Sequence, residues 1–418
     1  MGIFVAGATF DGEAAGLRIE DGLIAELGPD AVPGAADERI DGAGTAIVPG
    51  LVNGHTHAAM TLFRGYADDL PLMEWLQEHI WPVEARLDDD DVYWGTRLAC
   101  AEMIRTGTVR FWDMYWRPGA VARAVTDAGV RATIGPPLLD GGDPARIDEV
   151  RRAAGEGLAE IEANASPLTA PSLAPHAVYT VSPDSLAWIA AESERLGIPV
   201  QIHASETEQE VDDCIAAHGL RPVELLDQVG LLSPRALLAH AVWIDENERE
   251  LIASSGATVV SNPVANMKLA VGRIFDLGAA REHGLPVGLG TDGAGSNNSL
   301  DLFSDVKHFA LGQKHLARDP AAGAAPQAMA IARGELAPLL GATPLEVGAP
   351  ADLLLVRTDR HELGVGALDA GLVYAASGGV VDTTIVAGRV LMRGGVVDGE
   401  DEILERARER GRRLGLLG

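Results

Sequence analysis

Two histidines separated by a single residue, His55 and His57, close an apolar run in the segment PGLVNGHTH. Side chains two residues apart point to the same face of an extended strand, so both imidazoles can reach one ion. Imidazole is a common ligand of zinc and related divalent metals. Such a pair also occurs among surface and packing histidines, so its interpretation depends on the rest of the chain.

Three further side chains of metal-binding type lie at the ends of apolar runs later in the chain. His203 ends the run in PVQIHASE, His240 ends ALLAH, and Asp292 follows PVGLGT. Each histidine alone could be a satisfied core residue, but chance is a poor explanation for this residue type at every one of these strand ends. Nitrogen and oxygen ligands suit zinc or ferrous iron, and a coordination position left to water is what a catalytic site needs.

Glu206 follows His203 by three residues, where the predicted strand gives way to the next helix. A carboxylate beside an activated water can accept its proton and pass it to a ring nitrogen, which is general acid/base catalysis. The structural alternative is a glutamate at a helix N-terminus, stabilised there by the helix dipole.

The elements that must position these residues alternate along the chain. Short apolar runs of strand type, such as TVRFWDMY, RATIGPPLLD and ATVVSNP, are separated by helical patterns, as in parallel α/β folds. Counting the run that ends at VPGLVNGHTH gives eight strands, the number that closes a barrel with its active site at the carboxyl ends of the strands. We therefore predict the α/β class, with a (β/α)8 TIM-like barrel over residues 49–344.

Residues 1–48 and 345–418 have a different pattern. Both carry short β-type runs punctuated by glycine and aspartate, and the last residues, 400–416, form a charged amphipathic pattern typical of a surface helix. We predict that the two chain ends together build a small composite β-sandwich domain with a C-terminal helix.

The composition narrows the range of partners. The 418 residues include 61 acidic and 33 basic side chains, for a formal net charge of −28, and only three of the basic residues are lysines. Such a surface repels phosphates, so we expect a small-molecule substrate and neither nucleic acid nor membrane as a partner. This excess of acidic over basic residues, with so few lysines, is typical of proteins from salt-loving organisms. GC-rich coding bias is the other explanation.

The sequence also bears on location. It opens without the charged start and apolar stretch of a secretory signal, and it has no apolar run of about 18 residues that could span a membrane. We therefore expect a cytoplasmic protein. Assembly into a homo-oligomer is left open.

Six segments, PGLVNGHTH, FWDMY, HASE, LLAHAVWI, SNPVANMKLA and LGTDGAGSNNSLDLF, together resemble the methylthioadenosine and S-adenosylhomocysteine deaminase branch of the amidohydrolases. The resemblance covers essentially the whole chain. It implies hydrolytic deamination of an adenosine-type purine nucleoside to the inosine derivative and ammonia. It also implies one divalent metal ion, zinc with iron or manganese as alternatives, held by four ligands: His55, His57, His203 and Asp292.

The resemblance assigns catalytic roles around that ion to Glu206, His240 and Asp292. Glu206 would shuttle the proton, His240 would polarise the attacking water without binding a second ion, and Asp292 would deliver a proton to the departing ammonia. Binuclear members of the superfamily bridge two metals with a carboxylated lysine at the fourth strand. Because the first lysine here is Lys268, we expect a mononuclear site.

Substrate contacts are implied in the same way. Glu84 in WPVEARL matches a carboxylate that accepts hydrogen bonds from the ribose hydroxyls, and His176 in APHAVY matches a histidine that faces the nucleoside. Relatives that act on S-adenosylhomocysteine present two arginines to its carboxylate. Here Pro136 stands at the first of these places and Arg146 fills the second, which puts recognition of the homocysteine tail in doubt.

Two other functions stay open at this point. One is hydrolysis of another amino- or chloro-heterocycle, such as guanine or a triazine, which carries no ribose for Glu84 to bind. The other is a non-catalytic barrel retained as an assembly scaffold, which the complete set of ligands together with Glu206 disfavours.

Overall fold

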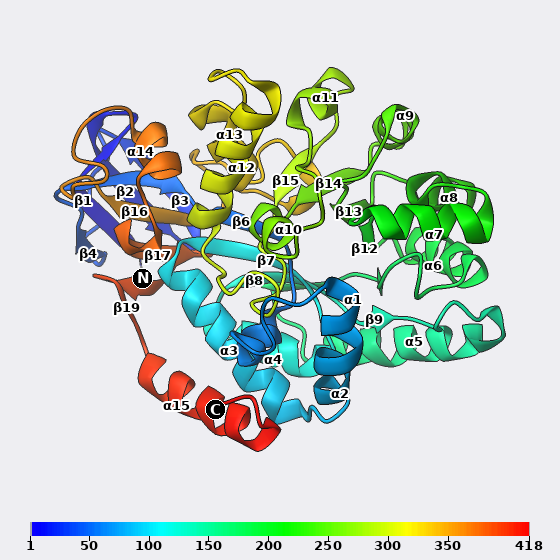
Figure 1. The fold of residues 1–418 in the computed structure, drawn as a ribbon. Coiled ribbons are helices and arrows are strands. Elements are labelled where there is room, and N and C mark those ends of the chain that lie inside the picture. The colour runs from blue at the N-terminus through cyan, green and yellow to red at the C-terminus, as the bar shows by residue number, and fades with distance from the viewer. Residues whose placement is uncertain (1, 418) are drawn as a thin grey trace.

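A computed structural model describes residues 2–417 of the chain, which form a mixed α/β structure (Figure 1). The two chain ends, predicted to build a β-sandwich together, share one hydrogen-bonded sheet of nine strands, drawn in blue and orange at the left of Figure 1. Its order is β19-β18-β17-β16-β5-β1-β2-β3, with β4 paired to β1. The strands are β1 (Ile3–Phe10), β2 (Glu13–Glu20), β3 (Leu23–Gly28), β4 (Glu38–Asp41), β5 (Thr45–Pro49), β16 (Leu353–Arg357), β17 (Val381–Val386), β18 (Arg389–Arg393) and β19 (Val396–Val397).

The junction between the two ends is the antiparallel pair β5 and β16, in which Thr45 faces Arg357 and Pro49 faces Leu353. Alternating side chains of both strands are buried in the core of this sheet. The N-terminal and C-terminal segments are therefore joined by main-chain hydrogen bonds as well as by packing.

The remaining strands are parallel and fall into three hydrogen-bonded groups. One group has the order β10-β8-β7-β6, the second is the pair β11-β9, and the third has the order β12-β13-β14-β15. Their bounds are β6 (Leu51–Thr56), β7 (Thr108–Met114), β8 (Arg131–Gly135), β9 (Pro137–Leu138), β10 (Thr169–Pro171), β11 (Ala174–Pro175), β12 (Val200–Ala204), β13 (Ala236–His240), β14 (Thr258–Ser261) and β15 (Val287–Leu289).

Isolated bridges and hydrogen bonds, not regular strand pairing, join neighbouring groups. Parallel bridges pair Leu173 with Val200 and Ala177 with His203, next to β11 and β12. At the other side, the Asp292 N–H donates to the His55 carbonyl at 3.0 Å. The regular ladders among the described residues thus stop short of one continuous eight-stranded barrel, because short strands and turns interrupt the pairing at these places.

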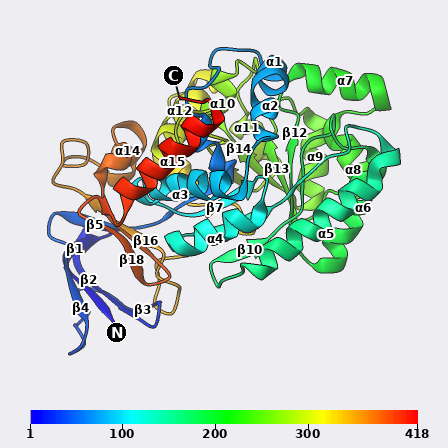
Figure 2. The same cartoon turned by 90° about the horizontal axis from the view of Figure 1, so that it is seen from below.

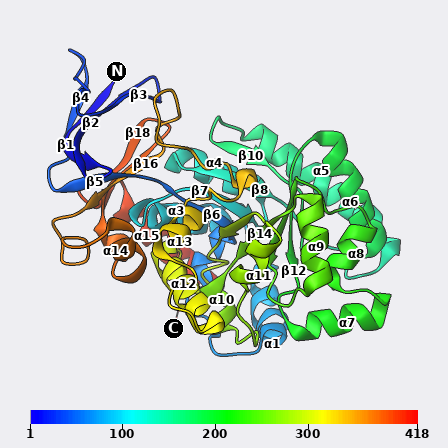
Figure 3. The same cartoon turned by 90° about the horizontal axis from the view of Figure 1, so that it is seen from above.

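Helices connect the parallel strands and lie outside them. Figures 2 and 3 show α5, α6, α8 and α9 around β12 and β14, with the mixed sheet at the opposite end of the molecule. The helices are η1 (Ala58–Phe63), α1 (Leu72–Glu74), η2 (Trp75–Ile80), α2 (Trp81–Glu84), α3 (Asp89–Arg105), α4 (Pro118–Ala128), η3 (Pro144–Arg146), α5 (Ile147–Ala163), α6 (Pro183–Leu196), α7 (Glu208–His218), α8 (Pro222–Gln228), α9 (Glu246–Ser255), α10 (Pro263–Lys268), α11 (Leu277–Glu282), α12 (Leu302–Ala317), α13 (Ala325–Ala332), η4 (Pro338–Leu340), α14 (Leu368–Tyr374), η5 (Gly378–Val380) and α15 (Glu400–Leu414).

Local sequence explains where these elements begin and end. Helix α6, for example, begins after Ser182, whose side chain accepts from the Ser185 N–H, and it ends at Gly197 in the left-handed conformation, a usual combination of caps. The strands β12 and β13 are buried along their whole length, as expected of parallel strands covered by helices. Between residues 2 and 417, no helix is both long and apolar enough to cross a membrane.

Candidate active site

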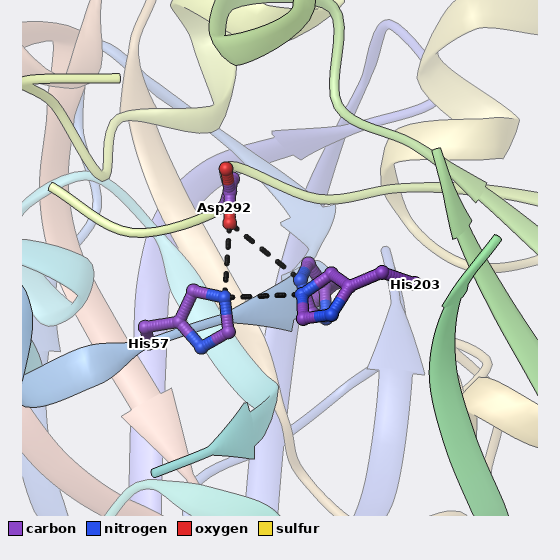
Figure 4. Close-up of side chains that lie close together, drawn as sticks. His57, His203 and Asp292 are labelled. Atoms are coloured by element: carbon purple, nitrogen blue, oxygen red, sulfur yellow. Dashed lines mark hydrogen bonds and ion pairs between the residues drawn. The ribbon is translucent and has the colours of Figure 1, made fainter. Parts of the chain in front are cut away.

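Four metal-type ligands converge at the carboxyl ends of the parallel strands, and Figure 4 labels three of them, His57, His203 and Asp292. One ligand atom from each of His55, His57, His203 and Asp292 lies within 4.8 Å of all the others. Asp292 Oδ1 is 3.2 Å from His57 Nε2 and 3.6 Å from His55 Nε2. His203 Nε2 is 3.3 Å from His57 Nε2. Three nitrogens and one carboxylate oxygen therefore face a common point.

The hydrogen bonds behind these ligands fix which ring nitrogen is free. His57 Nδ1 lies 2.7 Å from the Met114 carbonyl, and His203 Nδ1 lies 2.6 Å from the His176 carbonyl. A carbonyl only accepts, so Nδ1 carries the hydrogen in both rings and the Nε2 lone pairs face the cluster when the rings are neutral.

His55 provides the clearest evidence that this cluster fits a cation. Its side chain is fully buried, and neither of its ring nitrogens has a hydrogen-bond partner among the described residues. Buried polar atoms without partners are costly. A divalent ion at the common point would satisfy the His55 nitrogen that faces Asp292 and the two Nε2 lone pairs together. The donor set suits zinc.

The charges of the cluster are shifted by burial and by proximity. Burial lowers the pKa of His55 to about 4, so this ring stays neutral. Burial also disfavours the charged form of His57, but the adjacent Asp292 carboxylate outweighs that effect and raises the pKa of His57 to about 9. The neighbouring imidazoles in turn hold the pKa of Asp292 well below its usual value despite its burial. Asp292 is therefore an anion at neutral pH.

Glu206 and His240 lie beside the cluster. Burial raises the pKa of the Glu206 carboxyl, and one of its oxygens is 3.7 Å from His240 Nδ1. The Asn266 side-chain oxygen, 2.8 Å from the same nitrogen, accepts its hydrogen and fixes the ring. A buried carboxyl next to an imidazole is a suitable proton carrier.

The turns that carry these groups hold residues in an unfavourable conformation. Ser205, His240 and Asp292 all have φ between +51° and +74°, a region that costs a residue other than glycine about 1 to 3 kcal/mol. Three hydrogen bonds from two side chains support these turns. The Glu210 carboxylate accepts the Ser205 and Glu206 N–H groups at 2.8 and 2.7 Å, and the Ser296 hydroxyl donates to Asp292 Oδ2 at 2.6 Å.

A cavity of about 610 Å³ opens above the cluster. Its floor includes three of the ligands together with Glu206 and His240, and its walls are mainly apolar. The aromatic wall residues are Trp75, Trp81, Tyr115, Trp116 and Tyr179. The space has the size of a small-molecule site, with a few polar groups collected at one end.

The predicted substrate residues Glu84 and His176 both line this cavity. Burial raises the pKa of Glu84, and the Trp116 ring N–H donates to its Oε2 at 3.2 Å. Burial lowers the pKa of His176 to about 4, and its Nδ1 lies 2.9 Å from the Thr180 hydroxyl. At neutral pH His176 is therefore an uncharged ring beside the cluster.

Arg146 is not brought together with the others. Its half-exposed guanidinium pairs with Glu149 at 2.7 Å and donates to the Asp140 carbonyl at 3.2 Å. It is absent from the residues that line the cavity. The reason is local, because Glu149 lies one helical turn further along the same surface and satisfies the arginine there.

The aromatic walls and the supporting residues Glu210, Asn266 and Ser296 are not among the residues predicted from the sequence. Tyr115 and Trp116 directly follow the strand β7, a position that could have signalled them, since the carboxyl ends of parallel strands carry the site. The supporting residues gave no comparable signal, because their partners are set by the turns.

The chain is similar to one protein family and to relatives that are named as deaminases. Residues 46–391 match the amidohydrolase family. A relative from Methanoregula boonei, named 5'-deoxyadenosine deaminase, is 48% identical over 90% of this chain and 85% of its own length. A relative from Archaeoglobus fulgidus, named 5-methylthioadenosine/S-adenosylhomocysteine deaminase 1, is 43% identical over 95% of this chain and 94% of its own.

Among solved structures, an adenosine deaminase from Xanthomonas campestris with bound zinc is similar with a TM-score of 0.90 and 32% sequence identity. The match covers 99% of both chains. The similarity therefore extends over the parallel strands, the cluster and the mixed sheet together.

Proposed function

Because this chain belongs to the amidohydrolase family, we propose that it is a metal-dependent deaminase of adenosine-type purine nucleosides, releasing the inosine derivative and ammonia. The observation that carries the proposal is the convergence of His55, His57, His203 and Asp292 beneath a largely apolar cavity, with Glu206 at the same floor. The names of the two relatives and of the adenosine deaminase structure support the nucleoside substrate.

The four convergent residues would hold one divalent ion, with zinc preferred over iron or manganese. A bound ion supplies Lewis-acid chemistry, which lowers the pKa of water from about 15.7 towards about 7. Glu206 takes the proton of the attacking water and delivers it to the purine nitrogen next to the reacting carbon. His240, fixed by Asn266, orients the water. Asp292, an anion at neutral pH, accepts the second proton of the attacking water and delivers it to the amino group, which departs as ammonia.

Glu84 and His176 would orient the nucleoside. Glu84 accepts hydrogen bonds from the two ribose hydroxyls, and the Trp116 N–H keeps its carboxylate in place. Neutral His176 faces the nucleoside without adding charge. Flat aromatic walls suit a purine, because ring faces stack on one another.

The group on the 5' carbon is proposed to be small and uncharged. Arg146 is paired with Glu149 away from the cavity. The one arginine among the described lining residues, Arg117, pairs with Asp89 at 3.3 Å and donates to the Leu87 carbonyl. A homocysteine carboxylate would therefore have to compete with Asp89 for Arg117, whereas a 5'-deoxy or methylthio group would meet apolar walls.

Several finer features belong to the same proposal. They are a (β/α)8 TIM-like barrel over residues 49–344, a β-sandwich built from 1–48 and 345–418, a single metal per chain and a cytoplasmic location. A homo-oligomer is compatible with all of them. Hydrolysis of guanine or a triazine is the alternative activity, and Glu84 disfavours it because these substrates have no ribose.

A substrate panel tests the function. Ammonia release is measured from adenosine, 5'-deoxyadenosine, 5'-methylthioadenosine, S-adenosylhomocysteine, guanine and a chlorotriazine, with zinc supplied. The nucleosides with uncharged 5' groups are expected to have the highest kcat/KM. A higher kcat/KM for guanine or the triazine would refute the nucleoside assignment, and the absence of turnover in the whole panel would leave the scaffold as the better account.

A further inference from the structure

The short helix α10 carries two polar side chains with different partners, one in the active site and one beside it. Its Asn266 side chain holds His240 Nδ1 at 2.8 Å, and two residues later Lys268 reaches in another direction. Lys268 belongs to the segment SNPVANMKLA, which the mechanism above uses only through Asn266. The other contacts of this helix therefore have no role in the proposed chemistry so far.

Lys268 joins two segments that are far apart in the sequence. Its Nζ lies 2.7 Å from Asp68 Oδ1, 2.7 Å from Asn298 Oδ1 and 3.1 Å from the Gly295 carbonyl. Asn298 Nδ2 in turn donates to Asp68 Oδ2 at 2.7 Å, which closes a ring of contacts. The three hydrogens of one ammonium group match these three acceptors.

One of the two segments supports Asp292. The loop that contains Gly295 and Asn298 also carries Ser296, whose hydroxyl holds Asp292 Oδ2 at 2.6 Å. That contact leaves Asp292 Oδ1 to face His55 and His57. The ammonium group of Lys268 is thus bonded to Gly295, just before Ser296, and to Asn298, two residues after it.

The other segment leads to the cavity wall. Asp68 precedes α1, and the helical run from α1 through α2 carries wall residues from Leu72 to Glu84. The two segments also pack directly, since a Cβ added to Gly295 would lie 3.0 Å from the Trp75 ring. Fixing Asp68 therefore fixes where this wall stands relative to Asp292.

Both segments need such support. Ala67, Asp69 and Asn298 have φ of +54°, +66° and +68°, conformations that residues other than glycine rarely adopt without tertiary contacts. The pair Lys268 and Asp68 is mostly buried, with side chains 22% and 28% exposed. It is thereby less screened by salt than a surface pair.

We propose that Lys268 is a positioning residue. It fixes the position of the substrate-binding wall that follows Asp68 relative to the loop 295–298, whose Ser296 holds Asp292. This inference rests on the proposed function for its kinetic consequence, but not for its structural one. Lys268 touches neither substrate nor metal ligand and acts through Asp68, Gly295 and Asn298.

The test compares Lys268→Met with Lys314→Met in the full chain. Lys314 is a matched control, because its ammonium also donates to backbone carbonyls, those of Pro320 and Ala322, but it contacts neither of the two segments that Lys268 joins. Loss of charged hydrogen bonds predicts that Lys268→Met lowers kcat/KM by about ten- to a hundredfold, mainly through a higher KM. Zinc content should stay at one per chain, and Lys314→Met should match the wild type.

Hydrogen exchange provides a readout that does not need activity. Amides of residues 65–70 and 295–298 should exchange faster in Lys268→Met and not in Lys314→Met. Asp68→Asn combined with Lys268→Met should be no worse than Lys268→Met alone, because both remove the same contact. Unchanged kcat/KM and unchanged exchange in Lys268→Met would overturn the proposal. A wild-type protein without turnover would refute the proposed function. Hydrogen exchange in Lys268→Met would still test the structural role of Lys268 in that case.

Discussion

Glu206 and His203 lie three residues apart, yet they have different tasks in the proposed chemistry. His203→Ala removes a ligand and should lose both bound metal and activity. Glu206→Gln keeps every ligand, so it should retain one metal per chain and lose turnover by roughly a hundredfold or more, the usual range for general acid/base groups. Elemental analysis and ammonia release measure the two effects. Two tightly bound metals in the wild type would contradict the mononuclear site.

His57 makes metal binding depend on pH. Its pKa of about 9 in the metal-free protein means that the ring is protonated at pH 7, whereas a ligand must be neutral. Binding zinc at pH 7 should therefore release about one proton, and His55, with a pKa of about 4, should add none. The contribution of His57 to zinc affinity should rise about tenfold per pH unit up to pH 9 and then level off.

Calorimetry in buffers of different ionisation enthalpy measures this proton release. At pH 10, above the His57 pKa, the contribution of His57 should be absent, and the release that remains is that of the metal-bound water. A binding heat that does not depend on the buffer at pH 7 would show that His57 is already neutral.

At the scale of elements, the turn between β12 and α7 positions Glu206. Glu210 accepts the N–H groups of Ser205 and Glu206, and Ser205 is held at φ +51°. Glu210→Ala should lower kcat by about ten- to a hundredfold with little change in metal content, and should cost about 1 to 3 kcal/mol of stability for the unpaired buried groups.

Glu208→Ala is the control for that variant, because Glu208 is exposed on the first turn of the same helix. Steady-state kinetics and urea unfolding distinguish the two. Equal kinetics in both variants would mean that the turn keeps its shape without Glu210.

The residues in these turns show which parts of the site could be predicted from the sequence. His203, His240 and Asp292 were found because each follows a short apolar run, and parallel strands bring their carboxyl ends together. The interrupted ladder near β9 and β11 could not be predicted, since strands of two residues have no periodicity to read.

Contacts between residues that are far apart in the sequence could not be predicted either. The Lys268 to Asp68 pair spans 200 positions, and no local pattern predicts which acceptor a lysine will find. Arg146 is a case in which a local contact decided the outcome. The resemblance implied that it binds the substrate, but in the structure it pairs with Glu149, three residues away. Aromatic wall residues such as Trp75 were equally consistent with ordinary core packing.

For the whole molecule, the net charge of −28 sets the response to salt. Self-repulsion among acidic side chains destabilises the compact state and is screened at high ionic strength. The melting temperature should rise as potassium chloride goes from low to molar concentration. Thermal scans measure this, and a flat or falling melting temperature would assign the composition to coding bias.

The shared sheet has a consequence for how the chain is made. Strand β5 emerges from the ribosome early, but its antiparallel partner β16 is translated only after all the parallel strands. Until then the apolar edge of β5 has open hydrogen-bonding groups, the kind of edge that pairs with other chains. Polypeptides terminated before β16 would keep that edge, so incomplete products of this gene should accumulate as aggregates or be held by chaperones, even though they contain every residue of the proposed metal site.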